Sequence, residues 1–407
     1  MSYFKKTISG LSWTSALWGA IRVSALLRIA ILARLLSIEA FGAFGVATLV
    51  LSLLEILTET GINPFLLQEG EDYKKYLNTA WVISIIRGIF VSLLLIIVTP
   101  YVAAFFNITS SIPLLYIASL IPIIRGFINP ACIKFQKDLQ FHKEFYYRFS
   151  IVIIEIISSI IIVWFIRNAS GMVWALAVSA LAEVALSFLW IKPHPVFSLK
   201  LDQVKQILDR GKWITGFGIL DYTFSQGDNI VVGRMLGASA LGLYQNAYKI
   251  STLPLTGVSD TSYKVTFPVY VEMLKNPKAV KIAIIKHIAI ITPLLLVISS
   301  LVFIYARPIT LIVLGSSWLA AVPIVKVLAF LGAARGISFS MNSLFMALKL
   351  QKYVTLLTLI NVVGLFITIF PAVRLYGPVG AGMAATFGAV LALPFAFFFA
   401  IKLIRTL

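Results

Sequence analysis

The chain has 407 residues, of which 60% are hydrophobic and only 12% are charged, and its mean hydropathy is +0.96. A soluble domain carries about 25% charged residues, so this chain lacks the polar residues that a water-facing surface needs. The single cysteine excludes an internal disulfide and a cysteine metal cluster, and the three histidines show no metal-ligand spacing. Lysines and arginines on the cytoplasmic side of a membrane protein explain the net charge of +18 better than nucleic-acid binding does.

Twelve apolar runs follow one another with short loops between them, each near the length of about 20 residues that a membrane-spanning helix needs. The predicted spans cover residues 11–35, 41–67, 77–99, 111–133, 146–167, 172–191, 213–236, 240–264, 283–305, 320–347, 354–375 and 379–401. Arg22 and Arg28 interrupt the first run and no convincing cleavage site follows it, so we interpret it as a retained span. We therefore expect an all-α polytopic membrane protein without an extramembrane catalytic domain, a transporter rather than an enzyme.

Basic residues divide unequally between the two sides of these spans. With the N-terminus placed inside, the cytoplasmic segments hold 22 lysines and arginines. The opposite side holds five, namely Arg34, Arg167, Arg234, Arg307 and Arg374. The positive-inside rule therefore predicts that both termini lie in the cytoplasm and that the number of spans is even.

An internal repeat at an offset of 200 residues divides the chain into halves. Five residues between positions 34 and 47 are identical to their partners, namely Arg34, Leu36, Ala40, Gly42 and Ala47. Because six predicted spans separate the copies, both halves cross the membrane in the same direction, as in transporters built from parallel repeats. We expect two six-helix lobes related by a pseudo-two-fold axis along the membrane normal, the first over residues 1–197 and the second over residues 198–407.

The linker between these lobes, residues 192–211, places apolar residues among lysines and aspartates. They are Leu199, Leu201, Val204, Ile207 and Leu208. This pattern suits an amphipathic helix on the cytoplasmic interface, and a solvated connector is an equally good interpretation.

Fourteen ionisable residues fall inside the predicted spans or at their ends. They are Arg22, Arg28, Arg87, Arg125, Lys249, Lys326, Arg335, Glu55, Glu59, Glu155, Glu183, Asp221, Asp228 and Asp260. Each costs about 3 kcal/mol at the bilayer centre, so these side chains must face the protein interior, pair or reach an interface. An intramembrane charge is a functional-site hypothesis, and its alternative is a structural ion pair between helices.

Four of the acidic residues fall into two close pairs along the chain. Asp221 and Asp228 lie two turns apart on one predicted helix, and Glu55 and Glu59 lie one turn apart on another. Two carboxylates on one stripe repel each other, which favours a wet cavity or a proton or cation site over a dry packing face. We predict that these four carboxylates act in gating or coupling.

The arginines indicate an anionic ligand, because planar guanidinium groups bind phosphate oxygens bidentately. Arg28 corresponds to Asp228 in the 200-residue repeat. We predict that these two residues interact across the cleft between the lobes when the outer side is closed. As substrate-binding residues we predict Arg22 and Arg28, with Arg87, Arg125, Lys249 and Arg335 as supports, and we predict no metal site.

Several short segments together form a family pattern. They are Ala33-Arg-Leu-Leu-Ser-Ile-Glu-Ala-Phe-Gly42, Glu59-Thr-Gly61, Leu67-Gln68, Gln136-Lys-Asp-Leu-Gln-Phe141, Gly227-Asp-Asn-Ile-Val-Val-Gly-Arg234, Leu241-Gly-Leu-Tyr244, Ala247-Tyr248 and Leu253-Pro254. In combination they resemble the polysaccharide-transporter branch, the Wzx-type O-antigen and exopolysaccharide flippases, of the MOP (multidrug, oligosaccharidyl-lipid, polysaccharide) exporter superfamily. The resemblance covers residues from about 10 to about 270.

Two positions depart from the family's usual pattern, and a third bears on the lipid II flippases of the same superfamily. Ile38 stands where the family often has proline, and Glu59 stands where it often has aspartate. The six-residue spacing of Arg22, Arg28 and Arg34 also resembles that of the lipid II flippases of the superfamily. Those flippases often carry an aspartate where this chain has Ile29, which disfavours lipid II as the substrate.

The resemblance implies a V-shaped transporter of two lobes, similar to the MATE fold. Its expected substrate is an undecaprenyl-diphosphate-linked oligosaccharide, which is an O-antigen, capsule or exopolysaccharide repeat unit. Alternating access would carry it across the bacterial cytoplasmic (inner) membrane, with arginines holding the diphosphate, an aqueous cavity holding the sugar and the prenyl tail in lipid. No cofactor is implied, and a proton gradient and a sodium gradient stay open as energy sources. The expected partners are the lipid-linked substrate, membrane lipids, and a polymerase and chain-length regulator of the same pathway, without nucleic acid, and the chain is expected to be a monomer.

Two other functions stay open on the sequence alone. A multidrug or small-molecule antiporter of the same superfamily would share the fold. A membrane polysaccharide polymerase or ligase is disfavoured, because such an enzyme normally displays a large outer loop with catalytic residues.

Overall fold

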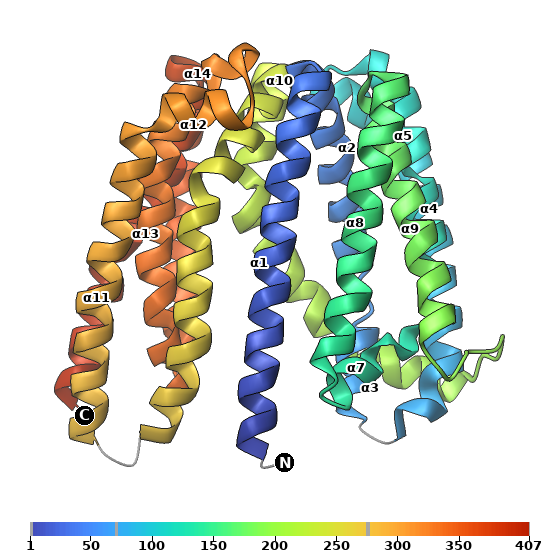
Figure 1. Cartoon of the computed structure of the whole chain (residues 1–407), viewed down its shortest axis with the longest axis horizontal. Coiled ribbons are helices and arrows are strands. Elements are labelled where there is room, and N and C mark those ends of the chain that lie inside the picture. Colours follow the sequence, from blue (N-terminus) through green and yellow to red (C-terminus); the bar gives the residue numbers. More distant parts are fainter. Residues whose placement is uncertain (1–2, 70–71, 274–276, 407) are drawn as a thin grey trace. The chain divides into compact units, whose positions relative to one another are not determined.

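The computed structural model describes residues 3–69, 72–273 and 277–406, and within these ranges it contains helices and no β-strand (Figure 1). The α-helices are α1 (Tyr3–Leu35), α2 (Ile38–Leu57), α3 (Ile62–Gln68), α4 (Tyr73–Phe106), α5 (Ile112–Ala118), α6 (Leu120–Gly126), α7 (Lys134–Lys137), α8 (Phe141–Ile166), α9 (Ala169–Trp190), α10 (Leu201–Met273), α11 (Pro277–Ile304), α12 (Ala306–Val313), α13 (Val322–Ala347) and α14 (Gln351–Thr406). Short 3₁₀ turns connect some of them, namely η2 (Thr109–Ser111), η3 (Pro130–Ile133) and η4 (Ser316–Ala321).

Nine helical segments of the described residues are long and apolar enough to cross a membrane, and the chain is a multi-pass membrane protein. The long helices α10 and α14 each bend at one glycine with non-helical backbone angles. These are Gly237, with φ of 82°, and Gly377, with φ of 59°, which glycine adopts without strain. The bends fall between the predicted spans 213–236 and 240–264, and between 354–375 and 379–401. The all-α polytopic fold is confirmed, and the number of twelve spans stays a prediction.

Contacts divide the chain into two compact units. Unit 1 comprises Met1–Gly227 with Gly237–Ser239, and unit 2 comprises Asp228–Leu236 with Ala240–Leu407. This division falls within α10, whereas the sequence places the lobe boundary at residues 197 and 198. The lobes with that boundary stay a prediction.

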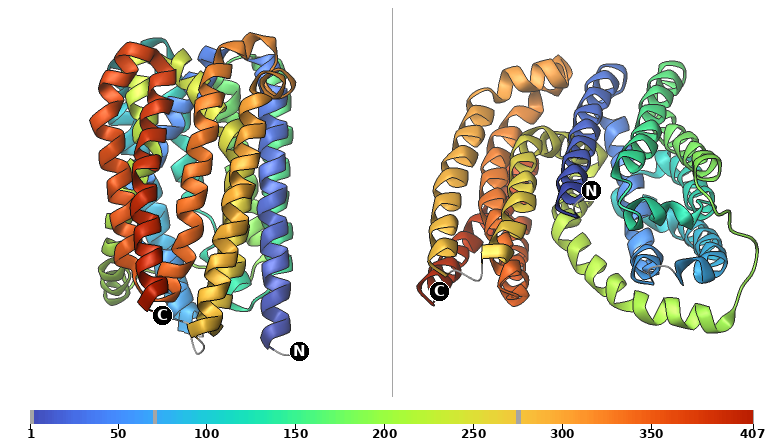
Figure 2. Two further views of the ribbon diagram at one scale, coloured as in Figure 1. Left: turned by 90° about the vertical axis from the view of Figure 1, so that its left-hand side faces the viewer. Right: turned by 60° about the horizontal axis from the view of Figure 1, so that its bottom comes forward.

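In unit 1, α4 packs against α6, α5 and α2, while α8 packs between α1 and α9 (Figures 1 and 2). The outward face of α8 carries large apolar side chains such as Ile157, Trp164 and Phe165, which are 52%, 55% and 80% exposed. A membrane surface is their fitting environment, because lipid tails solvate them as a protein interior would. Asn168 caps the start of α9 by accepting from the backbone N–H of Ser170 at 2.8 Å.

One close approach in unit 1 depends on a glycine in α2. A Cβ atom on Gly42 would lie 1.7 Å from the backbone oxygen of Ala238, directly after the bend of α10. Any side chain at this position would force the two backbones apart, so α2 can lie against the bend only because residue 42 is glycine.

The linker before the bend is a helix that docks on unit 1. The loop from α9 to α10 runs along the outside of the unit (Figure 2, right), and α10 begins at Leu201. Ile207 is fully buried among the side chains at the start of α4, and Gln203 accepts from Thr79 Oγ1 at 2.6 Å. Leu201 and Leu208 are exposed. From Leu201 on, the linker is therefore a helix with one side buried against α4 and the other side exposed, whereas residues 192–200 form an irregular and largely exposed segment.

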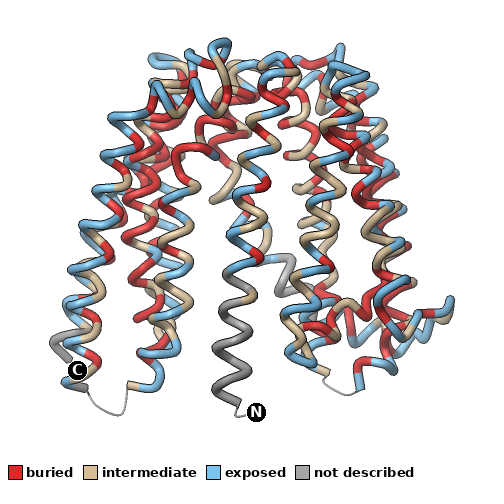
Figure 3. Tube along the Cα trace, in the orientation of Figure 1, coloured by how far each residue is buried: buried red, intermediate tan, exposed pale blue. Residues whose placement is uncertain are grey.

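In unit 2, α13 is the central helix and packs against both α11 and α14. Buried residues are concentrated along it, whereas α11 has an exposed outer side (Figure 3). His287 of α11 holds the end of α10, because its two ring nitrogens lie 2.6 Å from Ser262 Oγ and 2.7 Å from Tyr270 Oη.

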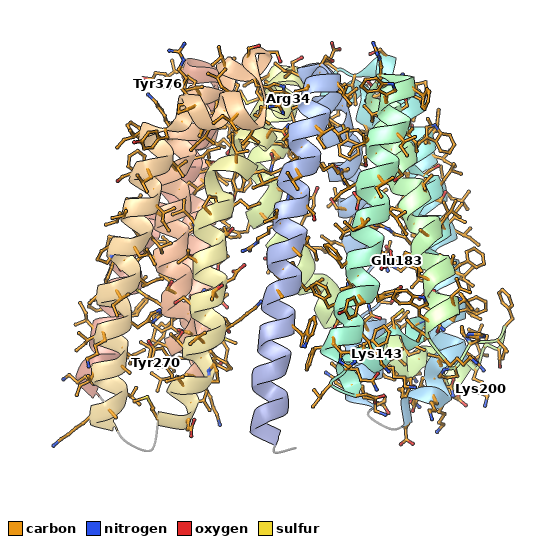
Figure 4. The ribbon with its side chains drawn as sticks, in the orientation of Figure 1. Arg34, Lys143, Glu183, Lys200, Tyr270 and Tyr376 are labelled. Atoms are coloured by element: carbon orange, nitrogen blue, oxygen red, sulfur yellow. The ribbon has the colours of Figure 1, made fainter. Side chains whose placement is uncertain are left out.

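Basic residues of unit 1 lie at the ends that the predicted topology requires. Lys143 and Lys200 lie at one end of the unit and Arg34 lies at the other (Figure 4). The sequence assigns the first two residues to the cytoplasmic side and Arg34 to the outer side. The orientation of the termini in the membrane stays a prediction.

Candidate functional site

A cavity of about 450 Å³ lies within unit 1, between α2, α4 and α6 and next to α3. Four of the ten predicted site residues line it, namely Glu55, Glu59, Arg87 and Arg125. The rest of the lining is polar or apolar without charge, namely Ser52, Ile56, Thr60, Ile62, Asn63, Ser84, Gly88, Val91, Pro122, Gly126, Ile128 and Pro130. The structure thus brings together two acidic and two basic residues from three separate segments of the sequence.

The crossing of α4 and α6 places the two arginines of this cavity. A Cβ atom on Gly88 would lie 2.3 Å from the backbone oxygen of Pro122, and one on Gly126 would lie 2.9 Å from that of Ser84. Both glycines therefore let the helices approach more closely than any side chain permits. Because Arg87 and Arg125 directly precede these glycines, the same crossing brings both guanidinium groups to the cavity.

Arg87 is fixed to the turn that ends α2. Its Nη2 donates to the backbone oxygen of Glu55 at 2.6 Å and to Glu59 Oε2 at 3.2 Å. Its Nε donates to Thr58 Oγ1 at 3.3 Å. One arginine therefore binds a helix-end carbonyl, a hydroxyl and a carboxylate of the same turn, a combination that orients it.

Arg125 has a looser contact. Its Nη1 lies 3.3 Å from Glu55 Oε1, longer than the roughly 2.7–2.9 Å of a typical hydrogen bond between a guanidinium and a carboxylate. The side chains of Arg125 and Glu55 are 40% and 29% exposed. This pair is therefore weakly held and accessible from the cavity.

The turn after α2 corrects one prediction about the acidic pair. The sequence places Glu55 and Glu59 one turn apart on a single helix, but α2 ends at Leu57 and Glu59 lies in the following turn. Gly61, with φ of 65°, permits the reversal into α3, and its backbone N–H donates to Glu59 Oε1 at 3.0 Å. Each glutamate thus faces its own arginine, so the two carboxylates do not form one repelling stripe.

Arg28 and Arg22 lie on α1, away from this set of contacts. Arg28 donates to the carboxylate of Glu155 on α8, and the two side chains are 20% and 23% exposed. This ion pair fastens α1 to α8 within the membrane-spanning region. Arg22 is half-buried on the same helix.

A second polar network lies in unit 2, around Asp228, which is 1% exposed. The Tyr244 hydroxyl donates to Asp228 Oδ2 at 2.8 Å, and the backbone N–H of Asn229 donates to Oδ1 at 2.8 Å. One turn after Tyr244, the hydroxyl of Tyr248 accepts from Arg335 of α13. The two tyrosine rings are 6.3 Å apart, so Asp228 and Arg335 stand at the two ends of a row of tyrosines.

The two remaining predicted residues, Asp221 and Lys249, are both exposed on α10. Asp221 and Asp228 therefore have opposite environments despite their spacing of two turns. Arg28 and Asp228 each have a partner within their own unit, and their interaction across the lobes stays a prediction. Within the described residues, no three His, Cys, Asp or Glu side chains gather as a metal site requires.

The sequence indicates the charges of these networks but not their partners. Tyr244 and Tyr248 appear in it only as part of the family pattern, and nothing singles out Thr58. One available signal is the Arg-Gly pair, which occurs in this cavity at Arg87-Gly88 and Arg125-Gly126 and elsewhere at Arg210-Gly211 and Arg335-Gly336. An arginine followed by a glycine in a membrane helix indicates a close helix crossing beside a charge.

The fold and the charged cavity together define a multi-pass membrane protein whose helices enclose a cavity with paired charges. Residues 31–323 match the family model described as Polysacc_synt_3, polysaccharide biosynthesis protein. This match covers more than half of the 407 residues, and the chain belongs to that family. The resemblance found in the sequence is confirmed.

Curated relatives are similar over most of the chain. The teichuronic acid biosynthesis protein TuaB of Bacillus subtilis (strain 168) is 26% identical, over 82% of this chain and 70% of its own length. The lipopolysaccharide biosynthesis protein WzxC of Escherichia coli (strain K12) is 23% identical, over 96% of this chain and 79% of its own length. The succinoglycan biosynthesis transport protein ExoT of Rhizobium meliloti (strain 1021) is 25% identical, over 74% of this chain and 60% of its own length.

Solved structures show the same fold. The lipid II flippase MurJ in an inward closed conformation matches 95% of this chain and 87% of its own, with a TM-score of 0.78 at 15% identity. An inward-facing multidrug resistance MATE family transporter of the MOP superfamily matches 96% of this chain and 94% of its own, with a TM-score of 0.68 at 14% identity.

Proposed function

We propose that this protein is a flippase that moves an undecaprenyl-diphosphate-linked oligosaccharide from the inner to the outer leaflet of a bacterial cytoplasmic membrane. The observation that carries the proposal is the cavity in which arginines and glutamates from three membrane helices converge, in a chain of a polysaccharide biosynthesis family. Intramembrane charges are costly and mark substrate pathways in membrane proteins. The names of three relatives, which refer to teichuronic acid, lipopolysaccharide and succinoglycan biosynthesis, support a saccharide substrate.

The proposed mechanism is alternating access by two lobes. Arg22 and Arg28 bind the diphosphate, the prenyl tail stays in lipid, and the sugar lies in a polar cavity. Asp221 and Asp228 act in gating or in coupling to a proton or sodium gradient. Both termini lie in the cytoplasm, and a polymerase and a chain-length regulator of the same pathway act with the protein. This is a transport function without covalent chemistry, so the protein is not an enzyme.

The test is complementation of a panel of flippase-deficient strains whose repeat units differ and are known. Restored surface polysaccharide in at least one strain, accompanied by transport of the lipid-linked saccharide in proteoliposomes, is the expected result. The second candidate, a multidrug antiporter, is favoured by the MATE-like fold. Drug export by the same proteoliposomes, without movement of lipid-linked saccharide, would replace the flippase by the antiporter.

A further inference from the structure

We propose that the cavity of unit 1 is the subsite for an uncharged sugar of the lipid-linked saccharide, and that the diphosphate binds elsewhere. This inference rests on the proposed function. It reassigns Arg87 and Arg125, which the sequence places among the supports for the diphosphate.

The charge of the cavity is the first argument. Its ionisable lining consists of two arginines and two glutamates, so the formal charges cancel. A diphosphate carries about two negative charges and would approach two carboxylates that already hold the arginines, and like charges repel. A neutral ligand has no such conflict.

The geometry of the accessible pair is the second argument. Arg125 and Glu55 are separated by 3.3 Å and are partly exposed to the cavity. A guanidinium only donates hydrogen bonds and an ionised carboxylate only accepts them. Two neighbouring sugar hydroxyls match this pair, because one accepts from Arg125 while the next donates to Glu55. Arg87 is a positioning residue here, since it holds the turn that carries Glu59 and the backbone oxygen of Glu55.

The uncharged lining is the third argument. Thr60, Asn63 and Ser84 add polar side chains to the lining. Polar groups of this kind in a cavity bind and orient a polar ligand. Apolar side chains such as Ile62 and Val91 complete the lining and suit the C–H faces of a sugar ring. The volume of about 450 Å³ lies within the range of small-molecule sites.

The decisive experiment is protection of a cysteine at the exposed lining position 63, made by Asn63→Cys. Its maleimide labelling rate is measured in nanodiscs with no ligand, with undecaprenyl diphosphate and with the same lipid bearing its oligosaccharide. We expect the glycosylated lipid to slow labelling at least 5-fold and the bare diphosphate to leave it unchanged. The wild-type chain, which contains only Cys132, measures background labelling.

Each other outcome overturns the inference. Equal protection by both lipids would place the diphosphate or the tail in the cavity, and protection by neither would show that no ligand enters it. If complementation succeeds while protection fails, the sugar subsite is wrong and the flippase stands. If complementation fails with every strain, the proposed function itself is wrong.

A transport experiment gives an independent reading. Asn63→Trp fills the cavity, whereas Leu67→Trp adds the same side chain one turn later on α3, at an exposed position outside the cavity lining. We expect Asn63→Trp to reduce translocation of a branched oligosaccharide lipid at least 10-fold more than that of the monosaccharide lipid, with Leu67→Trp close to wild type. An equal loss for both lipids, or no loss for either, contradicts a sugar subsite.

Discussion

The close crossings in unit 1 predict a graded response to Gly→Ala substitution. Alanine at position 88 would place Cβ 2.3 Å from the oxygen and 3.1 Å from the carbon of the Pro122 carbonyl. Both are backbone atoms, so no side chain can rotate away. Restoring an ordinary contact of about 3.4 Å requires α4 and α6 to separate by roughly 1 Å, and overpacking of this kind costs about 1–3 kcal/mol.

The distances from such a Cβ atom to its neighbours rank four glycines. Gly42 has the shortest distance at 1.7 Å, Gly88 follows at 2.3 Å and Gly126 at 2.9 Å, while a Cβ on Gly19 of α1 meets nothing within 4 Å. Alanine favours a helix over glycine by about 1 kcal/mol, so Gly19→Ala should be neutral or stabilising. We expect the thermal stability to fall in the order Gly19→Ala, Gly126→Ala, Gly88→Ala and Gly42→Ala.

The assay is the melting temperature of detergent-solubilised fluorescent fusions, followed by size-exclusion chromatography. For a chain of this length, a loss of about 2 kcal/mol corresponds to a fall of roughly 2 °C. Gly88→Ala should also lower transport, because the separation moves Arg125 away from Glu55. A melting temperature of Gly88→Ala equal to that of Gly19→Ala would refute the close crossing.

The other predictions concern single groups. Arg28→Lys should lower complementation at least 10-fold at normal protein levels, because lysine keeps a charge for Glu155 but lacks the planar guanidinium group. Arg34→Lys on the same helix is the control, and equal activity of the two variants would contradict a binding role for Arg28. Tyr244→Phe removes a donor to buried Asp228 and should cost about 1–3 kcal/mol, seen as a lower melting temperature than that of Tyr376→Phe, which alters an exposed tyrosine. Cys132 lies in η3, beyond the apolar helical segment Thr109–Gly126, and burial raises the pKa of its thiol to about 11. At pH 8, alkylation of Cys132 by iodoacetamide should therefore be more than 10-fold slower in the folded chain than in the unfolded chain. The rate in the folded chain should rise as the pH approaches 11, because the thiolate is the reacting form. Equal rates at pH 8 would show that the thiol is not shielded. Cysteines introduced after Ser170 and Gly315 should react with an impermeant reagent from outside the cell, and labelling only from the cytoplasm would overturn the topology.

The sequence alone predicts the class of fold, because the pattern of apolar runs and basic loops dominates it. Apolar runs of membrane length and the asymmetry of lysine and arginine require no knowledge of tertiary contacts. The bends of α10 and α14 also fall between predicted spans, at Gly237 and Gly377. The end of α2 is not evident in the sequence, because the apolar residues of α3, from Ile62 to Leu67, continue the run beyond the turn.

The sequence identifies the intramembrane charges but not the residues that pair with them, and the functional roles of these charges stay a prediction. The cost of an intramembrane charge identifies Glu55, Arg87 and Arg125 from composition alone. Which residues pair depends on helix crossings, and those depend on contacts between residues far apart in sequence. Arg28 illustrates the difference, because the repeat assigns it to Asp228 whereas the fold of unit 1 provides Glu155.

The pairing of charges bears directly on how a flippase could carry a sugar through a membrane. An arginine without a partner in the membrane holds an anion tightly and is costly to expose once the anion leaves. In the cavity of unit 1, Arg125 has Glu55 as its partner whenever the ligand is absent. When a sugar binds, its hydroxyl groups replace the Glu55 carboxylate as the partner of Arg125, and the net charge of the cavity does not change. Sugar binding and release there would leave the net charge of the cavity unchanged, whereas a diphosphate that binds Arg28 would have to compete with Glu155 for it. A single membrane protein can therefore keep a weak, reversible subsite for the variable sugar apart from a stronger electrostatic site for the invariant diphosphate.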